Sequence, residues 1–185
     1  MSQLKQDLVD ESLKFLTQGE LKDLSLRRIA SGIGVTHQAP YHHFKNKNEL
    51  LSEIQRQAYH QLALRYHEIL ITEDDPFRGF QRVGIEYINL FIGSPGYFKV
   101  IANGPLRLDS KHNEQKQCVE IMDTIIRRLC QVSSRKIDKD KLKMTCWSCA
   151  HGFCSLFLSG QVKIPKKDLQ NFIEENTLFL TELVQ

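Results

Sequence analysis

The stretch SLRRIASGIGVTHQAPYHHFKNKNEL, residues 25–50, restricts the fold more than any other part of this chain. Gly34 lies between two short segments with a helical pattern, and glycine readily takes the left-handed conformation that ends a helix. We therefore expect one helix over about residues 25–33, with Ser25 as its N-cap, and a second over about residues 36–44. Two short helices joined by a tight turn and packed on a preceding helix form a helix-turn-helix.

The same stretch is locally cationic, although the whole chain has a formal charge of only +3. Residues 25–48 include Arg27, Arg28, Lys45 and Lys47 and three histidines, but no acidic residue. A helix-turn-helix with such a face can place its second helix in the major groove of DNA. The outward side chains that we expect to contact bases or phosphates are those of Arg27, Thr36, His37, Gln38, Tyr41, His42 and Lys47.

Helical periodicity also dominates the rest of the chain, and no segment alternates with the period of a strand. We predict an all-α fold of about nine helices, in which a three-helix DNA-binding domain, residues 1–47, precedes a larger regulatory and dimerisation domain, residues 48–185. Besides these two helices, we predict an N-terminal helix that ends near Gly19. Further helices are predicted over about residues 46–71, 77–91, 97–102, 111–131, 141–159 and 166–183.

The helix-turn-helix also contains a family pattern. Gly34, Val35, Tyr41, Phe44, Lys47 and Leu50 follow the spacing G-V-x5-Y-x2-F-x2-K-x2-L. Over residues 8–54 the chain resembles the DNA-binding domain of TetR-family transcriptional regulators. The resemblance implies a transcriptional regulator that binds double-stranded DNA, rather than an enzyme. It also implies that Tyr41 and Lys47 contact phosphates. Trp147-x3-His151-Gly152 is similar to the signature of one TetR subgroup.

The last two predicted helices indicate a homodimer. Small residues, Ser148, Gly152, Ser155 and Ser159, gather on one side of the helix over 141–159, where a second helix could approach closely. The final helix has more apolar surface than one monomer core needs. We expect a four-helix bundle between two subunits, because two helix-turn-helix units about one DNA turn apart would read a palindromic operator.

The middle helices supply residues for a ligand pocket. An aromatic-rich helical body with a few polar groups suits a small, mainly apolar molecule. Such a ligand would release a repressor from DNA by changing the tilt of the helix over 46–71. The residues expected to line the pocket are Phe80, Tyr87, Phe91, Phe98, Ile101, Met122, Trp147 and His151, and the alternative is that they only fill the core.

Cys146-Trp147-Ser148-Cys149 raises a second possibility, a redox or metal site. A thioredoxin-like motif requires a βαβ unit, which the sequence lacks, and His151 projects away from both cysteines on a helix. We therefore interpret the two cysteines as core residues and expect no metal or cofactor. The remaining rival is a helical ligand-binding or thiol-dependent protein without sequence-specific DNA binding.

The sequence also suggests where the protein works. Its five cysteines are an odd number, and no apolar N-terminal segment typical of a signal peptide is present. No stretch approaches the roughly 20 apolar residues that span a bilayer. We therefore expect a cytoplasmic protein with reduced thiols and no membrane partner.

Overall fold

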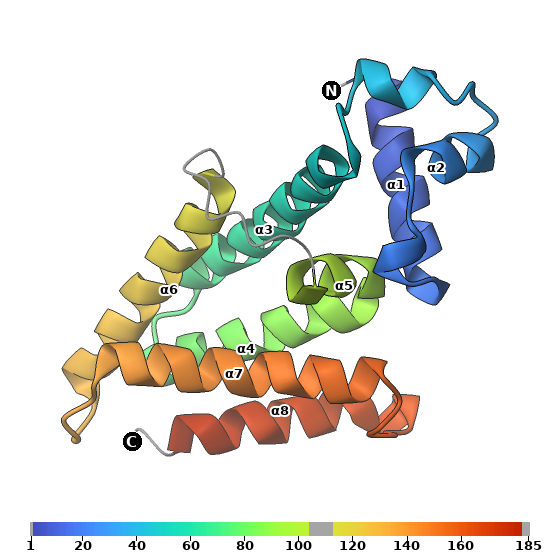
Figure 1. Ribbon diagram of the computed structural model, residues 1–185. Coiled ribbons are helices and arrows are strands. Elements are labelled where there is room, and N and C mark those ends of the chain that lie inside the picture. Colours follow the sequence, from blue (N-terminus) through green and yellow to red (C-terminus); the bar gives the residue numbers. More distant parts are fainter. Residues whose placement is uncertain (1, 104–112, 183–185) are drawn as a thin grey trace. The chain divides into compact units, whose positions relative to one another are not determined.

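The computed structural model describes residues 2–103 and 113–182, and these residues contain helices and no strands (Figure 1). This confirms the all-α prediction. The elements are α1 (Gln3–Gln18), the 3-10 helix η1 (Leu21–Asp23), α2 (Leu26–Gly32), the 3-10 helix η2 (Ala39–His42), α3 (Lys47–Thr72), α4 (Pro76–Gly93), α5 (Pro95–Asn103), α6 (Asn113–Val132), α7 (Lys139–Leu158) and α8 (Lys166–Glu182).

The chain forms two compact units, and α3 contributes to both. The first takes the described residues of 1–58 and 94–112, and the second those of 59–93 and 113–185. The first unit therefore contains α5, although α5 follows α4 of the second unit in the sequence. Its core is a single apolar cluster to which α1, α2, α3 and α5 all contribute: Leu8, Val9, Leu16, Leu24, Leu26, Ile29, Phe44, Leu50, Leu51, Ile54 and Val100.

Close packing fixes α5 against α1 within the first unit. A Cβ atom at Gly96 would lie 2.7 Å from the backbone oxygen of Leu13, so only glycine allows this approach. Lys99 donates a hydrogen bond of 2.9 Å to the carbonyl of Gly19, which follows the end of α1. A cation at this position is favourable because the C-terminus of a helix is partly negative.

In the second unit α4 is the central helix, and it packs against α6, α7 and α8. Its apolar residues recur at helical spacing and are buried, among them Phe80, Val83, Tyr87 and Phe91. Arg65 on α3 forms an ion pair of 2.6 Å with Glu86 on α4. The helices that form the second unit therefore converge on α4, as the apolar pattern of that segment requires.

Most predicted helices agree with the structure, but the predicted helix over 36–44 is wrong. Residues 39–42 form a 3-10 helix, in which Tyr41 N–H bonds to Gln38 O and His43 N–H bonds to Pro40 O. Pro40 is the physical reason, because it has no N–H for an α-helical bond and its ring clashes with the carbonyl four residues earlier.

Leu64, an apolar residue of the predicted helix over 46–71, is 55% exposed on α3. Lys111 and Leu183, at the ends of two predicted helices, lie outside the described residues. Among the described helices, none is long and apolar enough to cross a membrane.

Candidate nucleic-acid interface and ligand cavity

The turn between α2 and η2 determines where the predicted DNA-contacting segment points. Ser25 caps α2 by accepting a hydrogen bond of 3.2 Å from the N–H of Arg28, as predicted. At the other end Gly34 has a φ of 73°, and the N–H of Val35 bonds back to the carbonyl of Ala30. This is the Schellman arrangement, in which a left-handed glycine satisfies the last carbonyls of a helix and turns the chain sharply.

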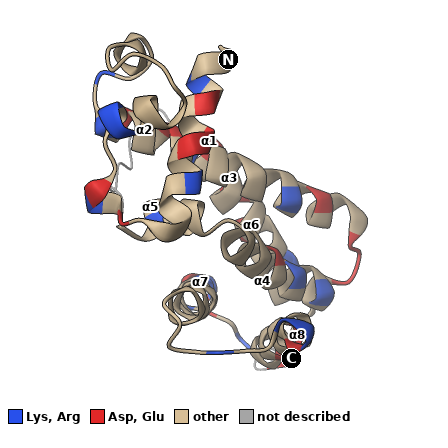
Figure 2. Ribbon diagram, turned by 90° about the vertical axis from the view of Figure 1, so that its right-hand side faces the viewer, with Lys and Arg blue, Asp and Glu red and all other residues tan. Residues whose placement is uncertain are grey.

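Six of the seven predicted DNA-contacting residues are exposed on this part of the first unit. They are Arg27, Thr36, His37, Gln38, Tyr41 and His42. From α2 to the start of α3 the ribbon shows basic but no acidic residues (Figure 2). The structure thus brings together, on α2, the turn and η2, side chains that can donate hydrogen bonds to phosphates or base edges.

Neighbouring contacts order this surface. The ring of His37 lies 3.0 Å from the hydroxyl of Ser31, measured from Nε2 to Oγ. The guanidinium of Arg28 stacks 4.7 Å from the ring centroid of Phe15, so Arg28 packs on α1. Arg27 and Arg28 are adjacent in sequence but their environments differ, which leaves Arg27 as the α2 arginine predicted to contact DNA.

Lys47, the seventh predicted residue, is only partly exposed. Its ammonium donates hydrogen bonds to the carbonyls of Leu21 and Lys22 in η1. Burial lowers the pKa of Lys47, and Asp23 partly offsets this effect by raising it. In this arrangement Lys47 ties the start of α3 to η1, a role that the sequence did not suggest.

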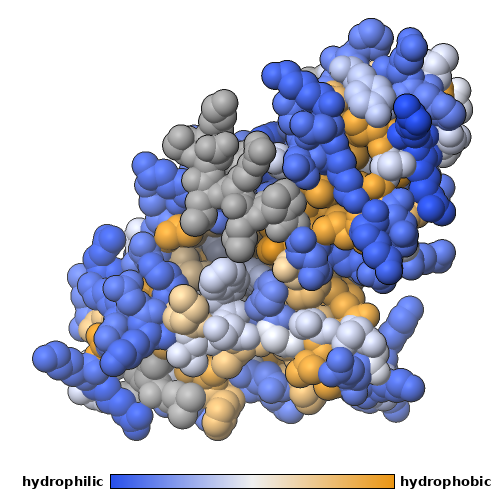
Figure 3. Space-filling view, viewed as in Figure 1, coloured by the Kyte–Doolittle hydropathy of each residue, from blue (hydrophilic) through white to orange (hydrophobic). Residues whose placement is uncertain are grey.

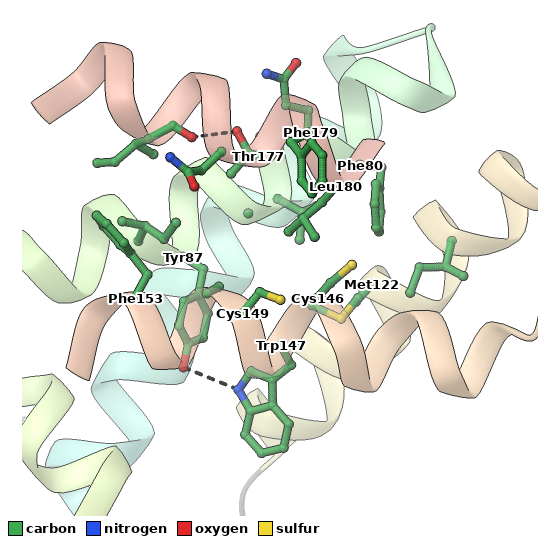
Figure 4. Close-up of a pocket in the computed structure, with 18 of the residues that line it drawn as sticks. Phe80, Tyr87, Met122, Cys146, Trp147, Cys149, Phe153, Thr177, Phe179 and Leu180 are labelled. Atoms are coloured by element: carbon green, nitrogen blue, oxygen red, sulfur yellow. Dashed lines mark hydrogen bonds between the residues drawn. The ribbon is translucent and has the colours of Figure 1, made fainter. Parts of the chain in front are cut away.

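The second unit contains an apolar cavity of about 230 Å³ (Figure 4). Residues of α3, α4, α6, α7 and α8 line it, and none of the described side chains in the lining is charged. The lining residues are Tyr66, Phe80, Gln81, Val83, Gly84, Tyr87, Ile88, Met122, Ile126, Cys146, Trp147, Cys149, Ala150, Phe153, Ile173, Asn176, Thr177, Phe179 and Leu180.

Four of the eight predicted ligand residues line this cavity: Phe80, Tyr87, Met122 and Trp147. Phe91 is fully buried beside it, with its ring edge-to-face to that of Tyr87 at a centroid distance of 4.6 Å. Phe98 and Ile101 do not line the cavity, because α5 belongs to the first unit. His151 does not line the cavity, but its ring lies within hydrogen-bonding distance of Tyr87, which does.

A hydrogen-bonded triad links α4 and α7 at the cavity wall. The hydroxyl of Tyr87 lies 2.9 Å from Nδ1 of His151, and it accepts a bond of 3.3 Å from Nε1–H of Trp147, shown in Figure 4. Burial raises the pKa of Tyr87 and lowers that of His151. Both effects favour uncharged side chains, so the triad adds polarity to the wall without adding charge.

The cysteines of the Cys-x-x-Cys motif both line the cavity, and all five thiols of the chain are free. Cys149 is exposed, so the interpretation of both cysteines as core residues is wrong for Cys149, whereas burial raises the pKa of Cys146 to about 12. Burial likewise raises the pKa of Cys154 and that of Cys118 to about 12. Among the described residues no group of three or more His, Cys, Asp or Glu could hold a metal ion.

We expect iodoacetamide to alkylate Cys149 in the native protein long before Cys146. A pKa of about 12 instead of 9.0 makes the thiolate of Cys146 roughly 10³-fold rarer near neutral pH, and the thiolate is the nucleophile. Fragmentation mass spectrometry of the tryptic peptide 144–163 would locate the label, with Cys149→Ser as the control. Equal labelling of Cys146 and Cys149 would contradict this assignment and favour a thiol-dependent function.

Sequence reasoning missed most of the α8 side of the cavity, and it missed Tyr66 on α3. Tyr66 lies four residues after Leu62 and three before Ile69, so helical spacing places it on the apolar side of that segment. A tyrosine at such a position combines apolar surface with a hydroxyl, a signal that could have identified it. The polar α8 residues Asn176 and Thr177 had no comparable signal in the sequence.

The N-terminal region is similar to a known protein family. Residues 8–54 match the family described as "Bacterial regulatory proteins, tetR family". No curated protein sequence matches the chain.

Several solved structures share the fold over nearly the whole chain. The TetR family transcriptional regulator PfmR from Thermus thermophilus is 21% identical, with a TM-score of 0.74 and 96% of each chain covered. The ketosteroid transcriptional regulator KstR2 of Mycobacterium tuberculosis is 16% identical, with a TM-score of 0.78, 100% of this chain and 96% of that one covered. FadR from Bacillus subtilis, solved in complex with stearoyl-CoA, is 17% identical, with a TM-score of 0.71 and coverage of 94% and 97%.

Proposed function

The chain belongs to the TetR family of DNA-binding transcriptional regulators, and we propose that it is a homodimeric repressor which a small, mainly apolar molecule releases from a palindromic operator. The observation that carries the DNA-binding part is the exposed surface of α2, the Gly34 turn and η2, which has basic residues and no acidic ones. Within it we assign DNA contact to Arg27, Thr36, His37, Gln38, Tyr41 and His42.

Lys47 fits a supporting role in this proposal. Its ammonium bonds to the η1 carbonyls, and the N-terminus of α3 lies at the same residue. Free N–H groups at a helix N-terminus attract phosphate even when the adjacent side chain is engaged elsewhere. We propose that the start of α3 receives a DNA phosphate and that Lys47 holds this terminus in place. Residues 1–47 would then read the operator, and residues 48–185 would regulate and dimerise.

Apolar side chains exposed on α7 and α8 support the dimer. Met144 is 59% exposed on α7, and Leu156 on the same helix and Leu178 on α8 are also exposed. Ser148 and Ser155 lie on the same side of α7 as Met144 and are exposed as well. In Figure 3 pale and hydrophobic side chains interrupt the hydrophilic surface over α7 and α8. Small and apolar residues together suit close packing of helices from two subunits.

The cavity supports a ligand of limited size. An apolar cavity of about 150 Å³ can hold benzene, so one near 230 Å³ has room for a monocyclic or small bicyclic molecule. FadR from Bacillus subtilis was solved in complex with stearoyl-CoA, which is a large and charged molecule. Because no charged side chain lines the cavity among the residues that the structure describes, we propose an uncharged and much smaller ligand.

Binding to the DNA upstream of its own gene tests the regulator directly. Fluorescence anisotropy of the purified protein should show a preference of ~10³-fold or more over unrelated DNA at the same salt concentration, with two chains per site. The affinity should also fall steeply as salt rises, because phosphate contacts release counterions. Weak and equal binding to both DNAs would contradict operator recognition at this site and favour the rival without sequence-specific binding.

A further inference from the structure

The hydroxyl of Tyr66 is a buried polar group that has no hydrogen-bond partner among the described residues. Tyr66 is 1% exposed and lines the cavity from α3. Among the described residues, no atom forms a hydrogen bond with its hydroxyl. Most buried polar groups in proteins have such a partner, and an unsatisfied one is costly. An occupant of the cavity could supply the missing partner.

The other polar groups of the α4–α7 wall are already engaged. Tyr87 is bonded to both His151 and Trp147, and the indole N–H of Trp147 is used in that contact. A ligand that bonded to Tyr87 in place of His151 would break one hydrogen bond to form another. The net gain in affinity from such an exchange is small.

The polar groups near α8 are engaged as well. Thr177 donates its hydroxyl to the carbonyl of Ile173 at 2.9 Å, within α8. The side-chain amide of Asn176 donates to a carbonyl one turn earlier, and that of Gln81 on α4 donates to the carbonyl of Glu174. Tyr66 therefore differs from these polar lining residues, because its hydroxyl is both fully buried and unsatisfied.

We propose that Tyr66 is the hydrogen-bonding anchor of the ligand, which is an uncharged molecule with a ring-sized apolar body and one oxygen acceptor, such as a ketone or an ether. This inference rests on the proposed function, because it names the chemical class of the molecule that the cavity takes. The apolar body fills the space among Phe80, Met122 and Phe153, and the oxygen accepts the Tyr66 proton.

The electrostatics of Tyr66 agree with a donor role. Burial raises the pKa of Tyr66 well above its ordinary value, and the neighbouring Cys118, Tyr87, Glu86 and Tyr59 add to this effect. The hydroxyl therefore keeps its proton at any physiological pH. A protonated hydroxyl without a protein acceptor favours ligands that bring an acceptor of their own.

The position of Tyr66 on α3 gives this contact a regulatory meaning. The same helix begins at Lys47, in the unit that contains the candidate DNA-contacting residues. A ligand that binds the Tyr66 hydroxyl acts on this helix directly, whereas a ligand held only by α4, α7 and α8 does not. The ligand can shift DNA affinity only if it binds more tightly to the protein with one tilt of α3 than to the protein with another.

Two isosteric probes test the proposal: acetophenone, which has a ketone oxygen, and α-methylstyrene, which has a methylene group at the same place. Isothermal titration calorimetry would give both dissociation constants for the wild-type protein and for Tyr66→Phe. We expect Tyr66→Phe to weaken acetophenone binding by about 5- to 20-fold, which corresponds to one lost hydrogen bond. The affinity for α-methylstyrene should change by less than about two-fold, because it offers no acceptor to lose.

Tyr59→Phe is the matched control, because it removes a hydroxyl from the same helix at a residue outside the cavity lining. It should leave both dissociation constants unchanged. Thermal unfolding checks the fold, and Tyr66→Phe should be at least as stable as the wild type, since it removes an unsatisfied buried hydroxyl.

Two outcomes would overturn the inference in different ways. If Tyr66→Phe changes acetophenone and α-methylstyrene binding equally, or changes neither, a buried water rather than the ligand satisfies the hydroxyl. The cavity would then still bind small molecules, as the proposed function requires. If the wild-type protein binds neither probe, the inference and the proposed ligand class are both wrong, while operator binding is judged by its own experiment.

Discussion

Replacing Phe44 with alanine is expected to lower the free energy of unfolding of the first unit by about 3–5 kcal/mol. Phe44 follows η2 and is only 2% exposed, and its ring packs in the core formed by α1, α2 and α3. The ammonium of Lys5 on α1 also lies 5.6 Å from its ring centroid. Removing the ring leaves a cavity where η2 is attached to the helices that support it.

Urea denaturation followed by circular dichroism would measure this loss, and fluorescence anisotropy would show that operator affinity falls with it. Phe44→Leu is the matched control, because it keeps an apolar side chain of intermediate size and should cost less. A Phe44→Ala protein as stable as the wild type would mean that Phe44 does not anchor the segment, contrary to its burial in the structure.

Replacing Tyr41, three residues before Phe44, with alanine should weaken DNA binding and leave the stability of the first unit nearly unchanged. Tyr41 is 49% exposed on η2, so its loss should change the free energy of unfolding by no more than about 0.5 kcal/mol. DNA affinity should fall by about 10- to 100-fold, because the proposed dimer would lose one phosphate contact of roughly 1 kcal/mol or more in each half-site. Anisotropy titration at one fixed salt concentration measures this effect.

Tyr41→Phe separates the two parts of the side chain, because it keeps the ring and removes only the hydroxyl. If the hydroxyl makes the contact, Tyr41→Phe should weaken binding nearly as much as Tyr41→Ala. An unfolded Tyr41→Ala domain whose folded fraction still binds DNA would refute the outward placement of Tyr41. Together, Phe44 and Tyr41 distinguish loss of fold from loss of contact within one short segment.

Local patterns made much of this fold predictable. Ser25 and Gly34 bound the segment that becomes α2, since one has the side chain of an N-cap and the other the freedom to adopt a positive φ. Phe44 and Leu50 are apolar positions of the family pattern in the sequence, and both belong to the buried cluster. Such features depend on neighbours in sequence and on burial, which apolar periodicity reveals.

The remaining features depend on partners far away in the chain. Nothing local shows that Lys47 bonds to carbonyls of η1, or that α5 packs on α1, so that Phe98 and Ile101 do not line the cavity of the second unit. The spacing of Tyr66 could have placed it on the apolar side of α3, but that its hydroxyl has no hydrogen-bond partner among the described residues is visible only in three dimensions. Pro40 is the exception, because its effect on η2 is local and could have been anticipated.

The first unit consists of two separate parts of the chain, and this affects when it can fold during synthesis. Val100 on α5 belongs to the core that α1, α2 and α3 share, yet residues 59–93 come between them in the sequence. During synthesis, the first helices therefore leave the ribosome before the segment that completes their core. For the same reason, a fragment ending at residue 58 would expose the apolar surface that Val100 covers, and a chimera that exchanges the DNA-reading part between relatives must transfer α5 along with it.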